Sequence, residues 1–148
     1  MGPARTVLFV CVENACRSLM AEAMFNRNPP DGWRAVSAGT QPAARANPRT
    51  EAMLREIGLE LPEHPPQPLT DERLRDALVI VTMGCLDSES CPANLRSAQV
   101  RDWGLPDPAR LDDDGFRAVR RDLLDLVEGL RRELAVSDRR RAALAGSR

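Results

Sequence analysis

Two residues near the N-terminus, Cys11 and Arg17, have the types and the spacing that nucleophilic chemistry on an oxyanion requires. A cysteine attacks as its thiolate, which forms at neutral pH where N–H dipoles and a nearby cation stabilise the negative sulfur. A guanidinium can hold two oxygens of the anion in a bidentate fork, which an ammonium group cannot do. The bare pattern C-x5-R occurs by chance, so its meaning depends on the structure around it.

The residues around this pair predict a strand, a tight loop and a helix. The apolar run 7–10 predicts a buried strand, and apolar residues recur at helical spacing after Ser18. A loop that leads into a helix N-terminus collects backbone N–H groups and the positive end of a helix dipole, which together bind a tetrahedral oxyanion. The glycine patterns of nucleotide-binding and dinucleotide-binding loops are both missing. The predicted oxyanion-binding loop therefore consists of Val12, Glu13, Asn14, Ala15, Cys16, Arg17 and Ser18.

Alternating strands and helices predict the rest of the fold. We expect further strands over 34–39, 78–82 and 98–101, and helices over 47–58, 70–76 and from 112 onward. Unbroken apolar strand runs are typical of a parallel sheet that is covered on both faces. The sequence thus predicts one α/β domain over 1–136, with a four-stranded parallel sheet flanked by helices on both faces. The polar, basic segment 137–148 is expected to be a flexible C-terminal tail.

Composition narrows the possible partners. The formal net charge is −1, so the basic surplus that nucleic-acid binding uses is missing. We find no signal peptide and no stretch near the roughly 20 apolar residues of a membrane span. We therefore expect a cytoplasmic protein with no nucleic-acid partner, no membrane partner and no cofactor. In that compartment the four cysteines are expected to be reactive or metal-binding rather than joined in structural disulfides.

The loop from Cys11 to Ser18 resembles the active-site loop of the low-molecular-weight protein tyrosine phosphatase fold. Within that fold, the chain is most similar to the thioredoxin-coupled arsenate reductases. Those enzymes have a second cysteine after a later strand and a third a few residues on, as Cys85 and Cys91 are placed here. The stretch 103–109 is also similar to the family's W-G-x-x-D-P-A segment. The resemblance covers nearly the whole chain.

This resemblance implies arsenate reduction, and so arsenical resistance, through a thiol–disulfide relay. Cys11 would attack arsenic held by the loop and Arg17, while Asp107 protonates the departing oxygen. Cys85 would then attack Cys11 and release arsenite. Cys91 would next attack Cys85, which leaves a disulfide for a thioredoxin-type partner to reduce. Phosphate and sulfate would compete with arsenate as oxyanions.

Other interpretations remain open. A tyrosine phosphatase would use the same loop and Asp107, although the chain has no tyrosine after that aspartate. A non-enzymatic sensor of oxyanions or peroxide would signal through Cys85 and Cys91. A zinc site built from the cysteines is disfavoured because Arg17 would repel the metal, so no metal site is predicted. Asp107 could also serve only as the cap of a turn.

Several loop residues carry more specific expectations. Val12, Glu13 and Ala15 stand where the family commonly has threonine, glycine and serine, and we expect the Glu13 carboxylate to point outward. Cys16 is expected to pack rather than react.

Some relatives hold potassium beside the loop with an asparagine and a glutamate, matched here by Asn14 and Glu22. They complete that site with oxygen ligands just after a histidine. Here His64 is followed by two prolines and a glutamine, which are poor ligands for a hard cation. We therefore expect Asn14 and Glu22 only to brace the loop and the first helix.

Overall fold

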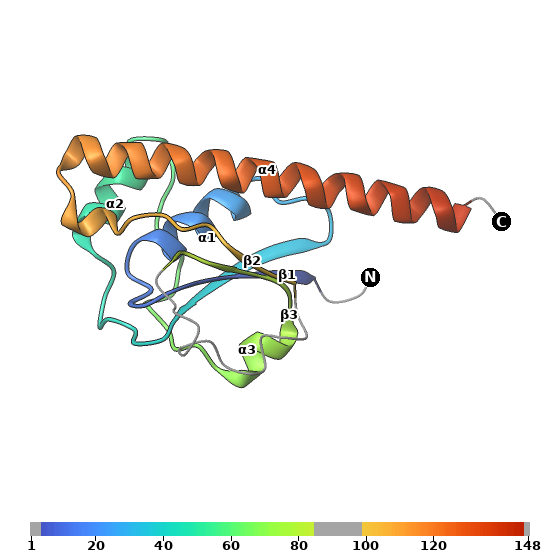
Figure 1. Cartoon of the computed structure of the whole chain (residues 1–148), viewed down its shortest axis with the longest axis horizontal. Coiled ribbons are helices and arrows are strands. Elements are labelled where there is room, and N and C mark those ends of the chain that lie inside the picture. The colour runs from blue at the N-terminus through green and yellow to red at the C-terminus, as the bar shows by residue number, and fades with distance from the viewer. Residues whose placement is uncertain (1–3, 85–98, 147–148) are drawn as a thin grey trace.

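The computed structural model describes residues 4–84 and 99–146, and Figure 1 shows its arrangement. A sheet of four strands has the order β2-β1-β3-β4. The strands are β1 (Arg5–Cys11), β2 (Trp33–Gly39), β3 (Ala77–Thr82) and β4 (Gln99–Asp102). All three neighbouring pairs are parallel, which confirms the predicted four-stranded parallel sheet.

The helices are α1 (Arg17–Arg27), α2 (Pro48–Arg55), α3 (Asp71–Asp76) and α4 (Asp113–Gly146), with a 3-10 helix η2 (Pro108–Arg110) before the last one. Local signals explain where two of them begin. The Asn47 side chain accepts a hydrogen bond from the Arg49 N–H at the start of α2, and the Thr70 side chain accepts from the Arg73 N–H at the start of α3. Within the described ranges, no helix combines the length and apolar character of a bilayer-spanning segment.

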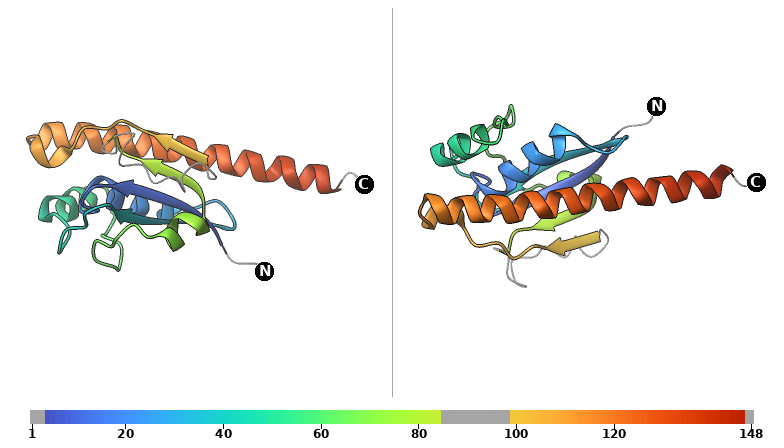
Figure 2. Two further views of the ribbon diagram at one scale, coloured as in Figure 1. Left: turned by 60° about the horizontal axis from the view of Figure 1, so that its bottom comes forward. Right: turned by 90° about the horizontal axis from the view of Figure 1, so that it is seen from above.

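Strand β1 is buried on both of its faces. Val7 and Phe9 belong to the larger apolar core, which contains side chains of α1, α2 and α4. Leu8 and Val10 belong to a smaller core with Leu74 of α3 on the opposite face. Figures 1 and 2 show α1 and α4 on one side of the sheet and α3 on the other. The expectation that helices cover both faces is confirmed.

The strand order places the loop after β1 where a ligand can reach it. The chain leaves β1 to form β2 on one side and later crosses over to form β3 on the other side. In open parallel sheets such a switch point opens a crevice beyond the carboxyl ends of the strands. Cys11 lies at that end of β1, opposite Gly39 of β2. The sheet thus delivers the predicted nucleophile to the crevice.

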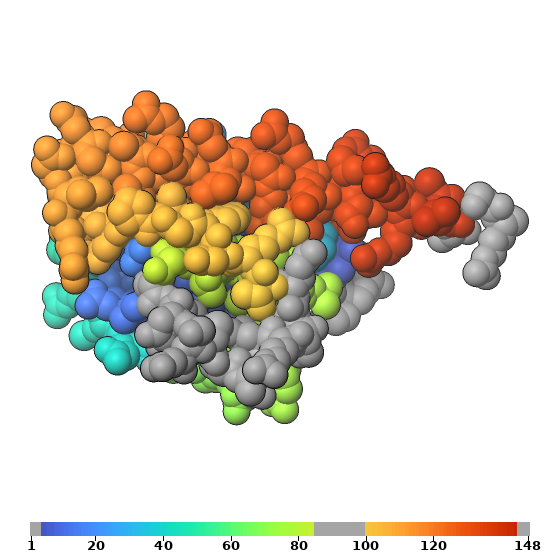
Figure 3. Space-filling model, viewed as in Figure 1, coloured from blue at the N-terminus to red at the C-terminus, as the bar shows by residue number. Residues whose placement is uncertain are grey.

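Helix α4 is longer than the sequence indicated. The segment expected to form a flexible tail continues the helix as far as Gly146. Asp138 anchors this extension to the sheet: its carboxylate accepts hydrogen bonds from the Arg5 guanidinium at 2.6 and 2.8 Å and from Trp33 Nε1 at 2.9 Å. The part of α4 beyond its apolar stripe is therefore held by polar contacts. Hydrophobic periodicity alone does not predict this part of the helix. Beyond this contact the helix projects past the sheet (Figures 1 and 3).

Replacing Asp138 by Asn should lower the free energy of unfolding by about 1–2 kcal/mol at pH 7, because a half-buried hydrogen-bonded ion pair is lost. Hydrogen bonds from Arg5 hold the pKa of the Asp138 carboxyl below its usual range. A lowered folded-state pKa contributes stability above the unfolded pKa of about 3.9, and that stability is lost as the pH falls through the folded value.

Urea unfolding of wild type and Asp138→Asn at pH 7 and at progressively lower pH measures this effect. Asp122→Asn, at an exposed position of the same helix, is the matched control. The gap between wild type and Asp138→Asn should shrink toward low pH, and a gap that stays constant would contradict the assigned ion pair.

Candidate active site

Hydrogen bonds to its carbonyl oxygens fix the loop between β1 and α1. Four of these carbonyls accept backbone N–H groups from the segment that follows β2, at 2.8–3.2 Å: those of Cys11, Val12, Glu13 and Ala15, bonded to Thr40, Gln41, Ala43 and Asn47. In a trans peptide the N–H of the next residue points away from the C=O. The N–H groups of residues 12, 13, 14 and 16 therefore face the opposite side. The Asn14 N–H shows this directly, because it points at Cys11 Sγ with a separation of 3.2 Å.

Two backbone features allow this packing. A Cβ atom on Gly39 would lie only 2.5 Å from the Val12 carbonyl oxygen and 2.9 Å from the Asn14 nitrogen, so only glycine permits the approach. Asn14 itself has a φ of 50°, in the left-handed region that asparagine tolerates better than most residues. The loop conformation therefore depends on the residue types at these two positions.

The Cys11 sulfur accepts more than one hydrogen bond. Asn14 Nδ2 donates to Ser18 Oγ at 2.7 Å, and Ser18 Oγ lies 2.9 Å from Cys11 Sγ. Because the Ser18 oxygen already accepts from Asn14, its own hydrogen is free to be donated to the sulfur. Together with the Asn14 N–H, this arrangement directs two hydrogen-bond donors at the Cys11 sulfur, which is 3% exposed.

The Arg17 guanidinium is held from behind. One terminal nitrogen donates to the Met83 carbonyl at 2.9 Å and to the Leu105 carbonyl at 2.7 Å. The side chain is buried, so these bonds fix its orientation and leave its other N–H groups for a ligand. Within the described residues, the first turn of α1 has no acidic residue and receives no side-chain cap from Cys16. Its positive end is therefore available to an anion.

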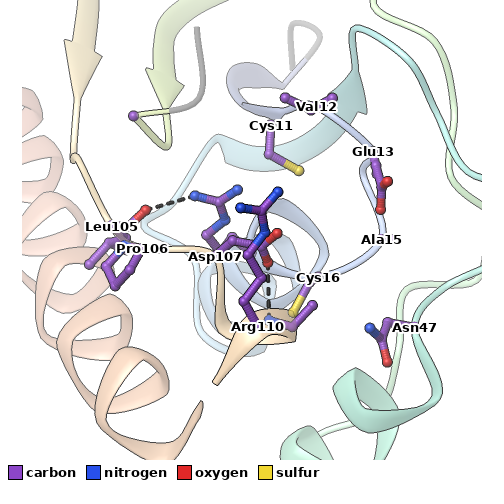
Figure 4. A pocket seen from close by; sticks show the side chains of 13 residues that line it. Cys11, Val12, Glu13, Ala15, Cys16, Asn47, Leu105, Pro106, Asp107 and Arg110 are labelled. Atoms are coloured by element: carbon purple, nitrogen blue, oxygen red, sulfur yellow. Dashed lines mark hydrogen bonds between the residues drawn. The ribbon is translucent and has the colours of Figure 1, made fainter. Parts of the chain in front are cut away.

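A cavity of about 390 Å³ opens over the loop and is shown in Figure 4. Cys11, Arg17 and Asp107, which the sequence had singled out, all line it. Asp107 Oδ1 accepts the Ala109 N–H at 3.0 Å, so this carboxylate caps η2 while it also faces the cavity. Asp107 therefore does cap a turn, as one interpretation of the sequence expected. The same side chain also lines the cavity, so the cap does not exclude a role in the pocket. The Glu13 side chain is exposed at the rim.

The other cysteines divide into two groups. Burial, partly offset by a hydrogen bond with Thr50, raises the pKa of the Cys16 thiol to about 12. Cys16 therefore stays protonated at neutral pH and is a poor nucleophile, although it lines the cavity. Cys85 and Cys91 lie outside the described residues. In the sequence Cys85 directly follows Gly84, which does line the cavity.

One arginine that lines the cavity, Arg110, belongs to none of the motifs that the sequence indicated. Arg110 ends η2, and its side chain extends into the pocket (Figure 4). The only sequence signal for it is its position three residues after Asp107, which becomes informative once the intervening turn is known to be helical.

The donor set beside the loop does not fit a bound cation. Both carboxylate oxygens of Glu22 face His64 Nε2, at 2.8 and 2.9 Å, and one also accepts from Ser37 Oγ. His64 Nδ1 lies 2.7 Å from the Pro65 carbonyl oxygen, so both ring nitrogens face oxygen atoms. Asn14 Oδ1 is occupied by the Gln67 N–H at 3.0 Å. These side chains are engaged in bracing the loop and α1.

Replacing potassium by sodium at constant ionic strength should therefore leave turnover of arsenate, the expected substrate, and the thermal unfolding midpoint nearly unchanged. His64→Ala should lower the free energy of unfolding by about 1–3 kcal/mol, because Glu22 is 5% exposed and loses its principal partner. Turnover assays and thermal unfolding of the wild type in each salt measure the first effect, and denaturant titration of wild type and His64→Ala measures the second. A saturable, several-fold stimulation of wild type by potassium would show that the oxygens of this site do coordinate a cation.

Comparisons with known proteins agree with this geometry. Residues 6–140 match the model of the low molecular weight phosphotyrosine protein phosphatases. An arsenate reductase of Staphylococcus epidermidis is 30% identical over 84% of this chain and 93% of its own length. A solved thioredoxin-dependent arsenate reductase of Corynebacterium glutamicum is 29% identical with a TM-score of 0.77; the match covers 92% of this chain but only 64% of that longer one.

An arginine phosphatase structure from Geobacillus stearothermophilus is 26% identical with a TM-score of 0.78, over 90% of this chain and 94% of that one. Relatives with the same architecture thus bear the names of a reductase and of a phosphatase. Because the family model covers most of its length, this chain belongs to the low molecular weight phosphotyrosine protein phosphatase family.

Proposed function

We propose that the protein is a cytoplasmic arsenate reductase whose disulfide is recycled by a thioredoxin-type reductant. The observation that carries the proposal is the Cys11 sulfur, which lies inside an oxyanion loop within hydrogen-bond reach of the Asn14 N–H and the Ser18 hydroxyl. The relatives named arsenate reductase, one of them thioredoxin-dependent, support arsenate as the substrate.

The first step places arsenate against the loop N–H groups and Arg17. The Cys11 thiolate attacks arsenic and forms an As–S bond, while an oxygen departs as water with a proton supplied by Asp107. The arsenic is still pentavalent at this stage. The fixed N–H dipoles of the loop favour this step because they need no reorientation as negative charge develops on the anion.

The electrons come from thiols in the second step. Cys85 attacks Cys11 Sγ, and the electron pair of the As–S bond passes to arsenic, which leaves as trivalent arsenite. A Cys11–Cys85 disulfide remains. Cys91 then attacks Cys85, which frees Cys11 and leaves a Cys85–Cys91 disulfide for a thioredoxin-type dithiol to reduce. Each attack breaks one bond to sulfur and forms one disulfide.

Phosphatase activity is the second candidate, favoured by the arginine phosphatase neighbour and by the residues that phosphate ester hydrolysis needs. Cys11, Arg17 and Asp107 suffice for that reaction, and all three line the described cavity. The reductase, in contrast, also needs Cys85 and Cys91. The two activities therefore separate according to which cysteines they require.

With thioredoxin, thioredoxin reductase and NADPH, the purified protein should reduce arsenate faster than it hydrolyses an aryl phosphate or phosphoarginine. Cys11→Ser should abolish all of these activities, because each needs the same thiolate. Cys16→Ala is the matched control in the same loop and should keep most of the activity, since its thiol is protonated. NADPH oxidation and phosphate release measure the rates. Ester hydrolysis without arsenate turnover would favour the phosphatase.

The relay predicts different stalled states for the other two cysteines. Cys91→Ser should release one equivalent of arsenite and stop with Cys11 joined to Cys85. Cys85→Ser should block arsenite release and spare aryl phosphate hydrolysis. Single-turnover arsenite assays with peptide mapping of the disulfide measure both outcomes. Normal turnover of Cys91→Ser with thioredoxin would eliminate the three-cysteine relay.

A further inference from the structure

We propose that Arg110 is a second oxyanion ligand in the Cys11 pocket and that it favours a small inorganic oxyanion over a phosphate ester. The proposal deepens the proposed function, since it concerns how the same site selects its substrate. It assigns to η2 a positive group that acts on the substrate from the side opposite the loop.

The position of Arg110 is fixed through its backbone. Its N–H donates to the Asp107 carbonyl at 3.3 Å, and the Leu111 N–H donates to the Pro108 carbonyl at 3.0 Å. Arg49 reaches the Ala109 carbonyl at 3.4 Å from α2 and holds the turn against the neighbouring helix. The side chain therefore starts from a defined point at the rim of the cavity and extends inward (Figure 4).

Among the described residues, no ion pair neutralises the charge of Arg110. Asp107 and Glu13 also line the cavity, but Arg110 forms no ion pair with either, and it has no hydrogen-bonded side-chain partner within the described residues. Arg17 brings a second guanidinium to the same 390 Å³ cavity. Two like charges in one partly closed space repel each other, and a bound dianion would turn that repulsion into attraction. An anion is therefore the ligand that this pair of side chains favours.

The in-line geometry decides which oxygen Arg110 meets. Three oxygens of a tetrahedral anion above Cys11 face the loop and Arg17, so the fourth points away from the sulfur toward η2. In arsenate or phosphate that oxygen is free and accepts a guanidinium N–H. In a phosphate ester it carries the organic group, and this hydrogen bond is weakened or lost. Arg110 would thus contribute to binding of the inorganic ion more than to binding of an ester.

The test uses inorganic phosphate, which binds without turnover. Calorimetric titration of the reduced full-length protein should give a phosphate Kd that rises on the order of 10-fold in Arg110→Gln, as expected for one charge-assisted hydrogen bond. Arg121→Gln removes the same charge from an exposed position of α4 and should leave the Kd unchanged. Thermal unfolding should be the same in all three proteins, because both arginines are exposed.

The selectivity is measured by kinetics with arsenate and an aryl phosphate. In Arg110→Gln the KM for arsenate should rise by a similar factor with little change in kcat, while the KM for the ester stays constant or falls. An unchanged phosphate Kd, or no phosphate binding by the wild type, would overturn the proposal. Equal loss for arsenate and ester would overturn its selectivity. Arg110-dependent phosphate binding without arsenate turnover would refute the proposed reductase but leave the second ligand intact.

Discussion

The site depends on the direction of the loop carbonyl groups, which point away from Cys11 and toward the segment after β2. Each carbonyl that bonds to the segment after β2 turns the next N–H toward the Cys11 side. If the carbonyls faced the cavity instead, their negative ends would repel both a thiolate and an oxyanion. The segment after β2 is therefore as important to the site as the loop itself, and at Gly39, the last residue of β2, the two backbones lie so near that a Cβ atom would not fit.

Arg17 links this loop to the other half of the sheet. Its bonds to the Met83 and Leu105 carbonyls join the loop after β1 to the segments after β3 and β4. A guanidinium has enough donors to do this and still bind a ligand, whereas a lysine ammonium offers three donors from a single point. The carboxyl ends of three parallel strands thus converge through one side chain. This explains why one cavity contains residues so distant in sequence as Cys11 and Asp107.

The sequence was sufficient for the features that local patterns encode. Apolar strand runs and helix-start signals predicted the parallel sheet, its two covered faces and the loop at the end of β1. Local patterns did not predict that His64 contacts Glu22 or that Arg110 lines the cavity. These contacts arise where segments far apart in the chain meet, at 42 residues of separation in the first case.

The end of the last helix shows the same limit. Asp138 looks like part of a polar tail in the sequence, yet it is half-buried and paired with Arg5 at a separation of 133 residues. Hydrophobic periodicity marks a helix by its apolar face. It therefore gives no signal for a helical segment that is held by an ion pair, as the end of α4 is.

The length of α4 separates its two ends by about 50 Å, given 34 residues at 1.5 Å each. Its first turns follow η2 beside the cavity, while its last turns stand clear of the sheet (Figure 2). A fluorophore or affinity tag attached to the far end is therefore remote from the oxyanion loop. Such a label can report on tumbling and on capture by a partner protein while the chemistry at Cys11 proceeds undisturbed.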